Sequence, residues 1–254
     1  MYTVCIPSHQ RILGINETAT ILLKELCQAQ VRGETAVQKL ISERLVATGC
    51  LVEEFEYDPA DVKVKGEFAI DQARAKDRRK AIVGTLSGSP QLPSLLVFAH
   101  PDGEMIGDIS QWRHDPFAGS IENGRLFGWG VADDLAGCAA AVAALESIAN
   151  SDQPMGSVIF ASTPSKRHAR GVSALLHNNI TADASLYLHP AESGSGMREI
   201  KAVASGHMEF QIIVKGCPPE TTEPGHTAFS HLAENPIDKA LMIRSALVTL
   251  AEER

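Results

Sequence analysis

The sequence predicts an α/β protein in which a layered sheet is followed by the beginning of a smaller α+β unit. Short apolar runs alternate with helical patterns between Leu51 and Leu188, two of the runs are apolar on both faces, and the pattern changes near Gly206. Strands that alternate with helices are typical of a sheet covered by helices. The chain of 254 residues, 44% of them hydrophobic, is long enough to bury such a core.

Two helices are expected at the start of the chain. Apolar residues recur at spacings of three and four between Glu17 and Cys50, and Gly33 divides this stretch in two. Gly49 stands where the second helix should end. Further on, the Ala-rich segment Leu135–Ile148 predicts a buried helix, and Val172–His177 predicts a short one.

Five segments before Gly206 have the pattern of strands. Leu51–Tyr57 alternates apolar and acidic residues, as a strand with one wet face does. Leu95–Ala99 and Val158–Ala161 are apolar throughout, which is typical of central strands with both faces covered. The other two strand candidates are Ala81–Leu86 and Leu186–Leu188, and the polar stretch Asp58–Arg79 predicts a connection with little burial.

A domain boundary is expected between Glu199 and Gly206, which divides the chain into residues 1–203 and 204–254. The second part has one predicted strand, His207–Val214, and one predicted helix, Pro236–Glu253. That is too little to bury a core alone, so this part must pack against its neighbour, another chain or sequence not present here.

Composition excludes several classes of protein. The net charge is −8 and no Lys/Arg-rich run is present, which argues against a nucleic-acid partner. No stretch of about 18 apolar residues is present, and the first residues lack the pattern of a secretory signal, so we expect no membrane association and a cytoplasmic location. The five cysteines are scattered without a CxxC pair, which argues against a disulfide framework or a cysteine zinc site.

A first candidate for chemistry is His100-Pro101-Asp102, directly after an apolar strand. Ligands in open α/β sheets bind beyond the carboxyl ends of strands. Imidazole is the commonest metal ligand among side chains, and a carboxylate two residues away would orient the ring. The alternative for this motif alone is a turn with a hydrogen-bonded histidine.

A second candidate is GRLFGWGVADDLAG, residues 124–137, which runs into the Ala-rich helix. Its glycines allow a close approach of the backbone, and Asp133 and Asp134 stand at the helix start. A carboxylate in that position is stabilised by the helix N-terminus without any metal, and this alternative is the expected one for one member of the pair.

Together the segments LLVFAHPD, WRHDPF and GRLFGWGVADDLAG resemble the ordered signature of the M20 metallopeptidase family, which includes aminoacylases, carboxypeptidases, dipeptidases and desuccinylases. The segment LVATGCLVEEF fits as well. The resemblance implies a three-layer αβα zinc-peptidase-like catalytic domain and the beginning of a lid or dimerisation domain. It implies that His100 is a metal ligand, that Asp102 tunes the catalytic base, and that Asp133 is the carboxylate bridging two metals.

The implied cofactor is Zn²⁺, one or two ions, with Co²⁺ or Mn²⁺ as alternatives. Such an ion lowers the pKa of a bound water and polarises an amide carbonyl, while a carboxylate base takes the proton.

The sequence departs from the family pattern where two adjacent glutamates are expected. The general-base glutamate corresponds to Ser165 and the metal-binding glutamate to Lys166. Serine is no comparable base at neutral pH without an activating partner. Lys166 is expected either to place its charge where the second metal would lie, leaving one ion, or to be a solvated surface charge together with Arg167.

His189, before Pro190, stands where the family has an acidic ligand. Histidine keeps a metal ligand there while removing a negative charge. One site is therefore expected from His100, Asp133 and His189, unless His189 is an ordinary turn residue. His168 and Glu192 are spare candidates for a ligand or base.

The segment GHTAFSHLAENPIDKA resembles the family's lid motif, in which His226 would stabilise the oxyanion in a partner subunit's site. The resemblance therefore implies a homodimer formed through the lid. Family members continue well past the end of this sequence, so the chain is expected to be a fragment or a reduced relative with one metal site.

The leading prediction is a metal-dependent hydrolase that cleaves the amide or peptide bond of a small N-acyl amino acid or peptide. One alternative is a catalytically inactive relative that binds a metal or small ligand without turnover. A second is an incomplete gene product with no activity of its own. Substrate identity lies beyond what the sequence predicts.

Overall fold

The computed structural model describes residues 9–63, 78–103, 106–164, 170–189, 200–202, 211–222 and 229–253. The chain forms two compact units, Met1–Ala204 and Ser205–Arg254. Each unit is described by itself below.

The first unit begins with the expected pair of helices, α1 (His9–Ala29) and α2 (Glu34–Ala47), with the short 3-10 turn η1 (Gln30–Arg32) between them. Gly33 separates them with a φ of +86°, a conformation that glycine adopts without strain. In the part of the chain that the structure describes, no helix has the length and apolar character needed to span a membrane.

The central sheet has five strands in the order β1-β2-β6-β3-β7. β6 lies in the middle and β3 lies beside it, which confirms that the two wholly apolar runs form interior strands. β3 pairs in parallel with both β6 and β7, whereas β1 and β2 pair antiparallel. The strands are β1 (Leu51–Tyr57), β2 (Arg79–Leu86), β3 (Leu95–Ala99), β6 (Val158–Ser162) and β7 (Ala184–Tyr187).

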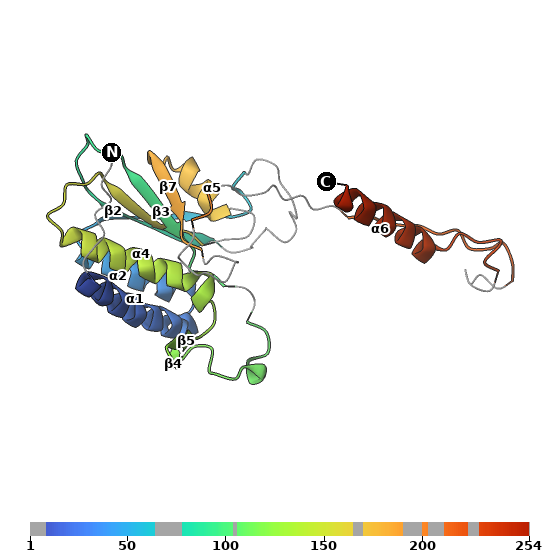
Figure 1. The fold of residues 1–254 in the computed structure, drawn as a ribbon, viewed down its shortest axis with the longest axis horizontal. Helices are drawn as coiled ribbons and strands as arrows, with labels where there is room; N and C mark the ends of the chain where they lie inside the picture. Colours follow the sequence, from blue (N-terminus) through green and yellow to red (C-terminus); the bar gives the residue numbers. More distant parts are fainter. Residues whose placement is uncertain are drawn as a thin grey trace. The chain divides into compact units, whose positions relative to one another are not determined.

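Helices cover both faces of this sheet, as the sequence predicted (Figure 1). α1, α2 and α4 (Ala136–Ala149) lie on one face, where they pack with Ile82 and Phe160 into the main core. α5 (Arg170–His177) covers the other face through Leu175, which packs with Val83. Neighbouring residues of one strand thus enter opposite cores, which is the period-2 pattern of a strand inside three layers.

The structure differs from the prediction at a hairpin and at β7. β7 begins at Ala184 rather than at Leu186 and ends before Leu188. The hairpin of β4 (Ser120–Glu122) and β5 (Arg125–Phe127) was not predicted, because three residues are too few to show a strand period. Its two-residue loop, Asn123-Gly124, has positive φ at both positions and is the sequence signal that identifies such a turn.

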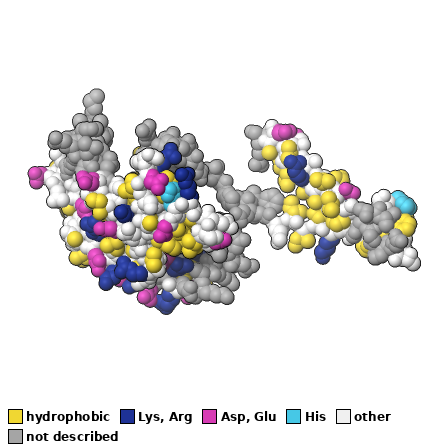
Figure 2. Space-filling view, turned by 90° about the horizontal axis from the view of Figure 1, so that it is seen from below, with side chains coloured by type: hydrophobic (Ala, Val, Ile, Leu, Met, Phe, Trp, Pro, Cys, Tyr) yellow, Lys and Arg dark blue, Asp and Glu magenta, His cyan; other side chains and the backbone are white. Residues whose placement is uncertain are grey.

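The second unit contains α6 (Pro236–Glu252), close to the predicted bounds. The Asn235 side chain accepts a hydrogen bond from the Ile237 amide at 2.9 Å, and Pro236 occupies the first turn, so the helix start is capped. Hydrophobic side chains gather along this helix in Figure 2. Leu241 and Met242 of this helix are exposed.

The predicted strand His207–Val214 is wrong where it can be compared. Residues 203–210 lie outside the described residues, and residues 211–214 form no strand. In the described part of this unit, strand-like pairing is limited to an isolated bridge between Cys217 and Glu234. The apolar run from Ile212 to Val214 suggested a strand, but Ile213 is 73% exposed, so no packed face supports one.

Candidate metal centre and active site

The candidate site lies at the edge of the sheet where β6, β3 and β7 end. These three neighbouring strands are parallel, so their carboxyl ends meet at one edge. His100 directly follows β3, and His189 follows β7 by two residues. Phe98 pairs with Tyr187, and the Leu188 amide donates to the Phe98 carbonyl at 3.0 Å. The two histidines therefore occupy equivalent places past the ends of paired strands.

Asp133 reaches this edge from the other direction. It lies in the turn η3 (Val131–Leu135), which leads directly into α4, and its φ and ψ of −141° and 84° are not helical. Gly130 begins the turn with a φ of +65°, and the Asp133–Asp134 peptide bond is cis. Because α4 packs against β3 and β6, the turn before it is held over their carboxyl ends.

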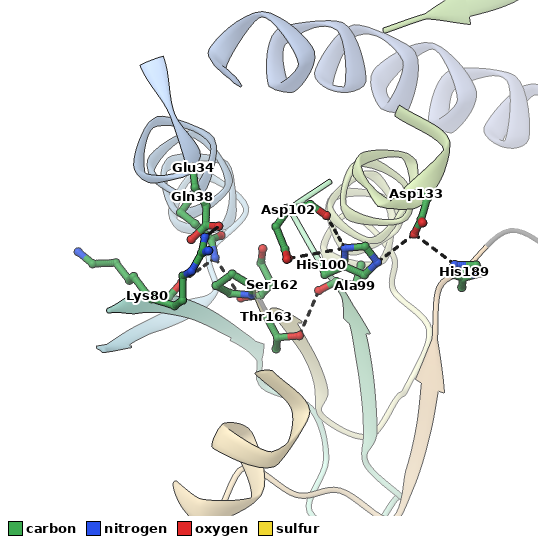
Figure 3. Close-up of polar contacts among 12 residues, drawn as sticks. Glu34, Gln38, Lys80, Ala99, His100, Asp102, Asp133, Ser162, Thr163 and His189 are labelled. Carbon is green, nitrogen blue, oxygen red and sulfur yellow. Dashed lines mark hydrogen bonds and ion pairs between the residues drawn. The ribbon is translucent and has the colours of Figure 1, made fainter. Parts of the chain in front are cut away.

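The structure brings His100, Asp133 and His189 together. The Nε2 atom of His100 lies 3.0 Å from Oδ1 of Asp133, and Nε2 of His189 lies 3.2 Å from the same oxygen. Figure 3 shows His100 between Asp102 and Asp133, with His189 on the far side of Asp133. The side chain of His100 is 3% exposed, whereas those of His189 and Asp133 are 30% and 37% exposed. Of the three candidate ligands, His100 is thus buried, and Asp133 and His189 are partly open.

The orientation of the His100 ring is fixed by Asp102, through its backbone. Nδ1 of His100 lies 2.8 Å from the backbone carbonyl oxygen of Asp102, whereas the Asp102 carboxylate is farther away, with Oδ1 at 3.7 Å. A carbonyl oxygen only accepts, so Nδ1 carries the proton. The sequence prediction named the Asp102 carboxylate as the orienting group, and the structure assigns the closer contact to the carbonyl.

Asp134 plays a different part from its neighbour. Its side chain is buried, with 1% of the residue exposed, and it lies over the first turn of α4. A Cβ atom on Gly137 would collide with the Asp134 carboxyl group, so glycine is needed for this approach. The sequence analysis expects one of the two aspartates to be a helix N-terminal carboxylate, and Asp134 is the one whose carboxyl group lies against the first turn of α4.

Tyr187 is a residue of this site that the sequence analysis missed. Its ring stacks on that of Phe98 with centroids 5.0 Å apart, and it lies 5.3 Å from the His189 ring and 6.3 Å from the His100 ring. Burial and the nearby carboxylates, Asp134 first among them, raise the pKa of the Tyr187 phenol. The signal in the sequence was the position of Tyr187 directly before Leu188 and His189.

Gln38 braces this edge of the sheet from α2. Its amide nitrogen donates to the Lys80 carbonyl at 2.8 Å and to the Ser162 carbonyl at 3.2 Å, and the residue is 1% exposed. Ser162 is the last residue of β6, and the next amide, that of Thr163, donates to the Ala99 carbonyl at 2.9 Å. These bonds fix the end of β6 beside the start of the His100 loop.

Other predicted site residues lie outside the described residues. They are Ser165, Lys166, Arg167, His168, Glu192 and His226. Among the residues that the structure describes, no three His, Cys, Asp or Glu side chains form a ready-made metal-binding group. The histidines instead contact one Asp133 oxygen directly.

Residues 96–249 match the sequence model of Peptidase family M20/M25/M40. This range includes both histidines of the site and Asp133. The chain belongs to this family.

Curated relatives agree with membership in peptidase family M20/M25/M40. The succinyl-diaminopimelate desuccinylase of Ehrlichia canis is 34% identical over 158 residues, which cover 59% of this chain and 40% of that protein. The enzyme of the same name from Leptothrix cholodnii is 29% identical over 228 residues, covering 87% of this chain and 53% of that protein. The chain thus spans about half the length, or less, of these relatives.

Solved structures show the same fold. Human carnosine dipeptidase 1 has a TM-score of 0.53 at 15% identity, with 70% of this chain and 39% of that chain covered. The dipeptidase Dug1p from Saccharomyces cerevisiae has a TM-score of 0.52 at 16% identity, with coverage of 71% and 40%. The prediction of an M20-type three-layer fold is thereby confirmed.

Proposed function

We propose that this chain provides the catalytic unit of a metal-dependent hydrolase that cleaves amide or peptide bonds in small N-acyl amino acids or peptides. The single observation that carries the proposal is the convergence of His100 Nε2 and His189 Nε2 on Oδ1 of Asp133. Membership in the peptidase family supports the class of reaction. The names of the relatives make succinyl amides the first substrates to test.

The donors fit a divalent cation. Nδ1–H of His100 donates a hydrogen bond to the Asp102 carbonyl, so the lone pair of Nε2 faces Oδ1 of Asp133. This carboxylate oxygen is also an acceptor. Two acceptors this close repel each other unless a proton or metal cation lies between them. Tetrahedral zinc ligands at roughly 2.0–2.2 Å from the ion are about 3.4 Å from one another, so contacts of 3.0 and 3.2 Å need only a small outward shift.

His100, Asp133 and His189 would hold the ion, with Zn²⁺ favoured by two imidazoles and one carboxylate and with Co²⁺ or Mn²⁺ as alternatives. When bound, the ion would supply an activated water and a polarised carbonyl. The Asp102 carbonyl keeps the proton of His100 on Nδ1, so that Nε2 stays a ligand. Asp133 and His189 are more exposed than His100, so a substrate would approach the ion from their side.

The remaining roles rest on the family resemblance. Asp102 would tune the base, Ser165 occupies the base position, and His226 would stabilise the oxyanion. With Lys166 in place of a metal-binding glutamate, we propose one ion per chain rather than two. We also propose a cytoplasmic homodimer formed through the second unit, where the exposed apolar side chains of α6 offer a surface.

A second candidate function is binding of a metal or small ligand without turnover. The observation that favours it is the sequence Ser165-Lys166, which removes the usual base and a usual ligand.

Zinc titration of purified protein by calorimetry tests the metal site. We expect one ion per chain, and we expect His189→Ala to lower the affinity by more than the roughly 10- to 100-fold that the loss of an outer-shell partner costs. His177→Ala is the matched control, because His177 is an exposed histidine bonded to its own helix at the Ser173 carbonyl.

Hydrolysis of a panel of succinylated and acetylated amino acids then separates the two functions. Turnover with bound zinc supports the hydrolase, and bound zinc without turnover supports the second candidate. Two tightly bound ions per chain would contradict the one-ion site, and zinc affinity unaffected by His189→Ala would overturn the assignment of ligands.

A further inference from the structure

A cavity with charged residues in its lining lies beside the candidate metal centre, in the first unit. It has a volume of about 600 Å³ and lies between the start of α2, the start of β2 and the loop after His100. Asp102 belongs to both places: its carbonyl orients His100, and the residue also lines this cavity.

The charged part of the cavity lining is an ion pair with an additional carboxylate. Nη1 of Arg79 lies 2.5 Å from Oε2 of Glu34, and their side chains are 29% and 21% exposed. Asp102 is the third charged residue of the lining. With one guanidinium and two carboxylates ionised, the lining has a formal charge of −1.

The pKa of Glu34 is raised above its ordinary value, mainly because the carboxyl group is buried. Burial raises this pKa, the Arg79 guanidinium lowers it, and the Asp102 carboxylate raises it again. The net direction is upward in spite of a direct ion pair. Because the carboxylates of Glu34 and Asp102 line the same cavity, a positive charge between them would be attracted by both.

The rest of the cavity lining is apolar and includes an indole. Val37, Ile106 and Trp129 contribute to it. The Trp129 ring packs against Gly103, where a Cβ atom would lie 3.2 Å from the ring, and its backbone carbonyl accepts from Gln30 at 2.8 Å. Indole is the best aromatic partner for a cation, and the aliphatic walls suit a short hydrocarbon stem.

We propose that this cavity binds a primary ammonium group on a short apolar stem, with the ammonium between Glu34 and Asp102 and the stem against Trp129. The consequence for catalysis rests on the proposed function. If the chain is a hydrolase, its preferred amide substrates carry a second, free ammonium group at some distance from the bond that is cleaved. The binding itself requires no metal.

The test uses n-pentylammonium, pentanoate and 1-pentanol as probes, with the metal removed by a chelator. In a Trp112→Phe background, Trp129 is the one tryptophan left, because the sequence has two. We expect n-pentylammonium to change its fluorescence and, by calorimetry, to bind at least about tenfold more tightly than the other two probes. Equal binding of all three probes, or tighter binding of pentanoate, would overturn the proposal.

Two variants provide a matched pair, because both break the same ion pair but change the cavity charge in opposite directions. Glu34→Gln should weaken n-pentylammonium binding about tenfold, and Arg79→Gln should strengthen it about tenfold. A change in the same direction in both variants would mean that structure rather than charge is responsible, which contradicts the proposal.

If either single variant fails to fold, the double variant Glu34→Gln/Arg79→Gln keeps the formal charge of −1 without a buried unpaired ion. It should retain n-pentylammonium binding within about threefold of the parent, and loss of binding would count against the cavity. Zinc titration is independent of these measurements, so failure of the metal site and failure of this cavity are distinguishable.

Discussion

Gly137 lies so close to Leu188 that a Cβ atom on the glycine would stand 2.5 Å from the Leu188 carbonyl oxygen. The same atom would collide with the Asp134 carboxyl group, so an alanine at this position would push apart the start of α4 and the end of β7. Asp133 lies in the turn directly before α4, and His189 directly follows Leu188, two residues after β7. We expect Gly137→Ala to cost about 1–3 kcal/mol of stability and to weaken zinc binding about tenfold or more.

Gly84→Ala is the control for that variant, measured by urea unfolding and zinc titration. Its Cβ would lie 2.9 Å from Cδ1 of Leu45, the far end of a flexible side chain in α2, away from the histidines. It should lose stability while zinc affinity stays unchanged. If both variants left zinc affinity intact, Gly137 would not hold the ligands in register.

Bound zinc should stabilise the fold, because the ion separates acceptor atoms that otherwise face one another. At a free zinc concentration of 100 times Kd, the free energy of unfolding should rise by about 2.7 kcal/mol. Asp133→Asn keeps the size of the side chain but removes its charge, and it should abolish most of this gain. Thermal melts with zinc, and again after addition of EDTA, measure the effect. A gain that persists in Asp133→Asn would place the stabilising ion elsewhere.

The convergence of the three candidate ligands could be anticipated only in part from apolar runs in the sequence. Leu95–Ala99 is recognisably buried, and a histidine after such a strand lies at its carboxyl end. Which strand lies beside which is set by pairing across the sheet, and no local pattern in the sequence contains it. The prediction that His100 and His189 lie close together therefore rested on the family resemblance. The structure shows this proximity through the pairing of β3 with β7.

The cavity between Glu34, Arg79 and Asp102 could not be predicted, for a similar reason. These residues come from three elements, and the polar stretch before Arg79 reads only as a connection. Gln38 is a comparable case: it is a polar residue in a helical pattern, and only the packed structure shows that it is buried. Burial of a single polar residue depends on tertiary neighbours rather than on helical period.

Gln38→Leu should be strongly destabilising, because it leaves the Lys80 and Ser162 carbonyl oxygens without the amide that donates to them. We expect a loss of about 1–3 kcal/mol in urea unfolding. Gln28→Leu is the matched control, since Gln28 is exposed and its amide donates to the Ala118 carbonyl at 3.2 Å at the surface. Equal effects in the two variants would mean that Gln38 is not a structural brace.

Asp183 should make stability depend on pH in the acid range. Its carboxylate accepts from the Ser94 amide and hydroxyl, each at 2.7 Å, and these bonds lower its pKa below the ordinary 3.8. Since the folded pKa is the lower one, the stabilisation is fully present above pH 3.8 and is lost as pH falls through the folded pKa.

Asp183→Asn should therefore be less stable than the parent at pH 7, and the difference should shrink as the pH is lowered past 3.8. Urea unfolding across this range measures it, with the exposed Asp152→Asn as control. A difference between Asp183→Asn and the parent that is constant with pH would show that the carboxylate charge is not responsible.

The pairing of Phe98 with Tyr187 has a consequence for folding. A slip of β7 by one position along β3 would displace His189 by about 3.3 Å and turn its side chain toward the opposite layer. Only in the native register can the imidazoles of His100 and His189 bind the same cation. A bound ion would thus select correctly aligned chains during assembly of the sheet, and misaligned ones would gain nothing from it.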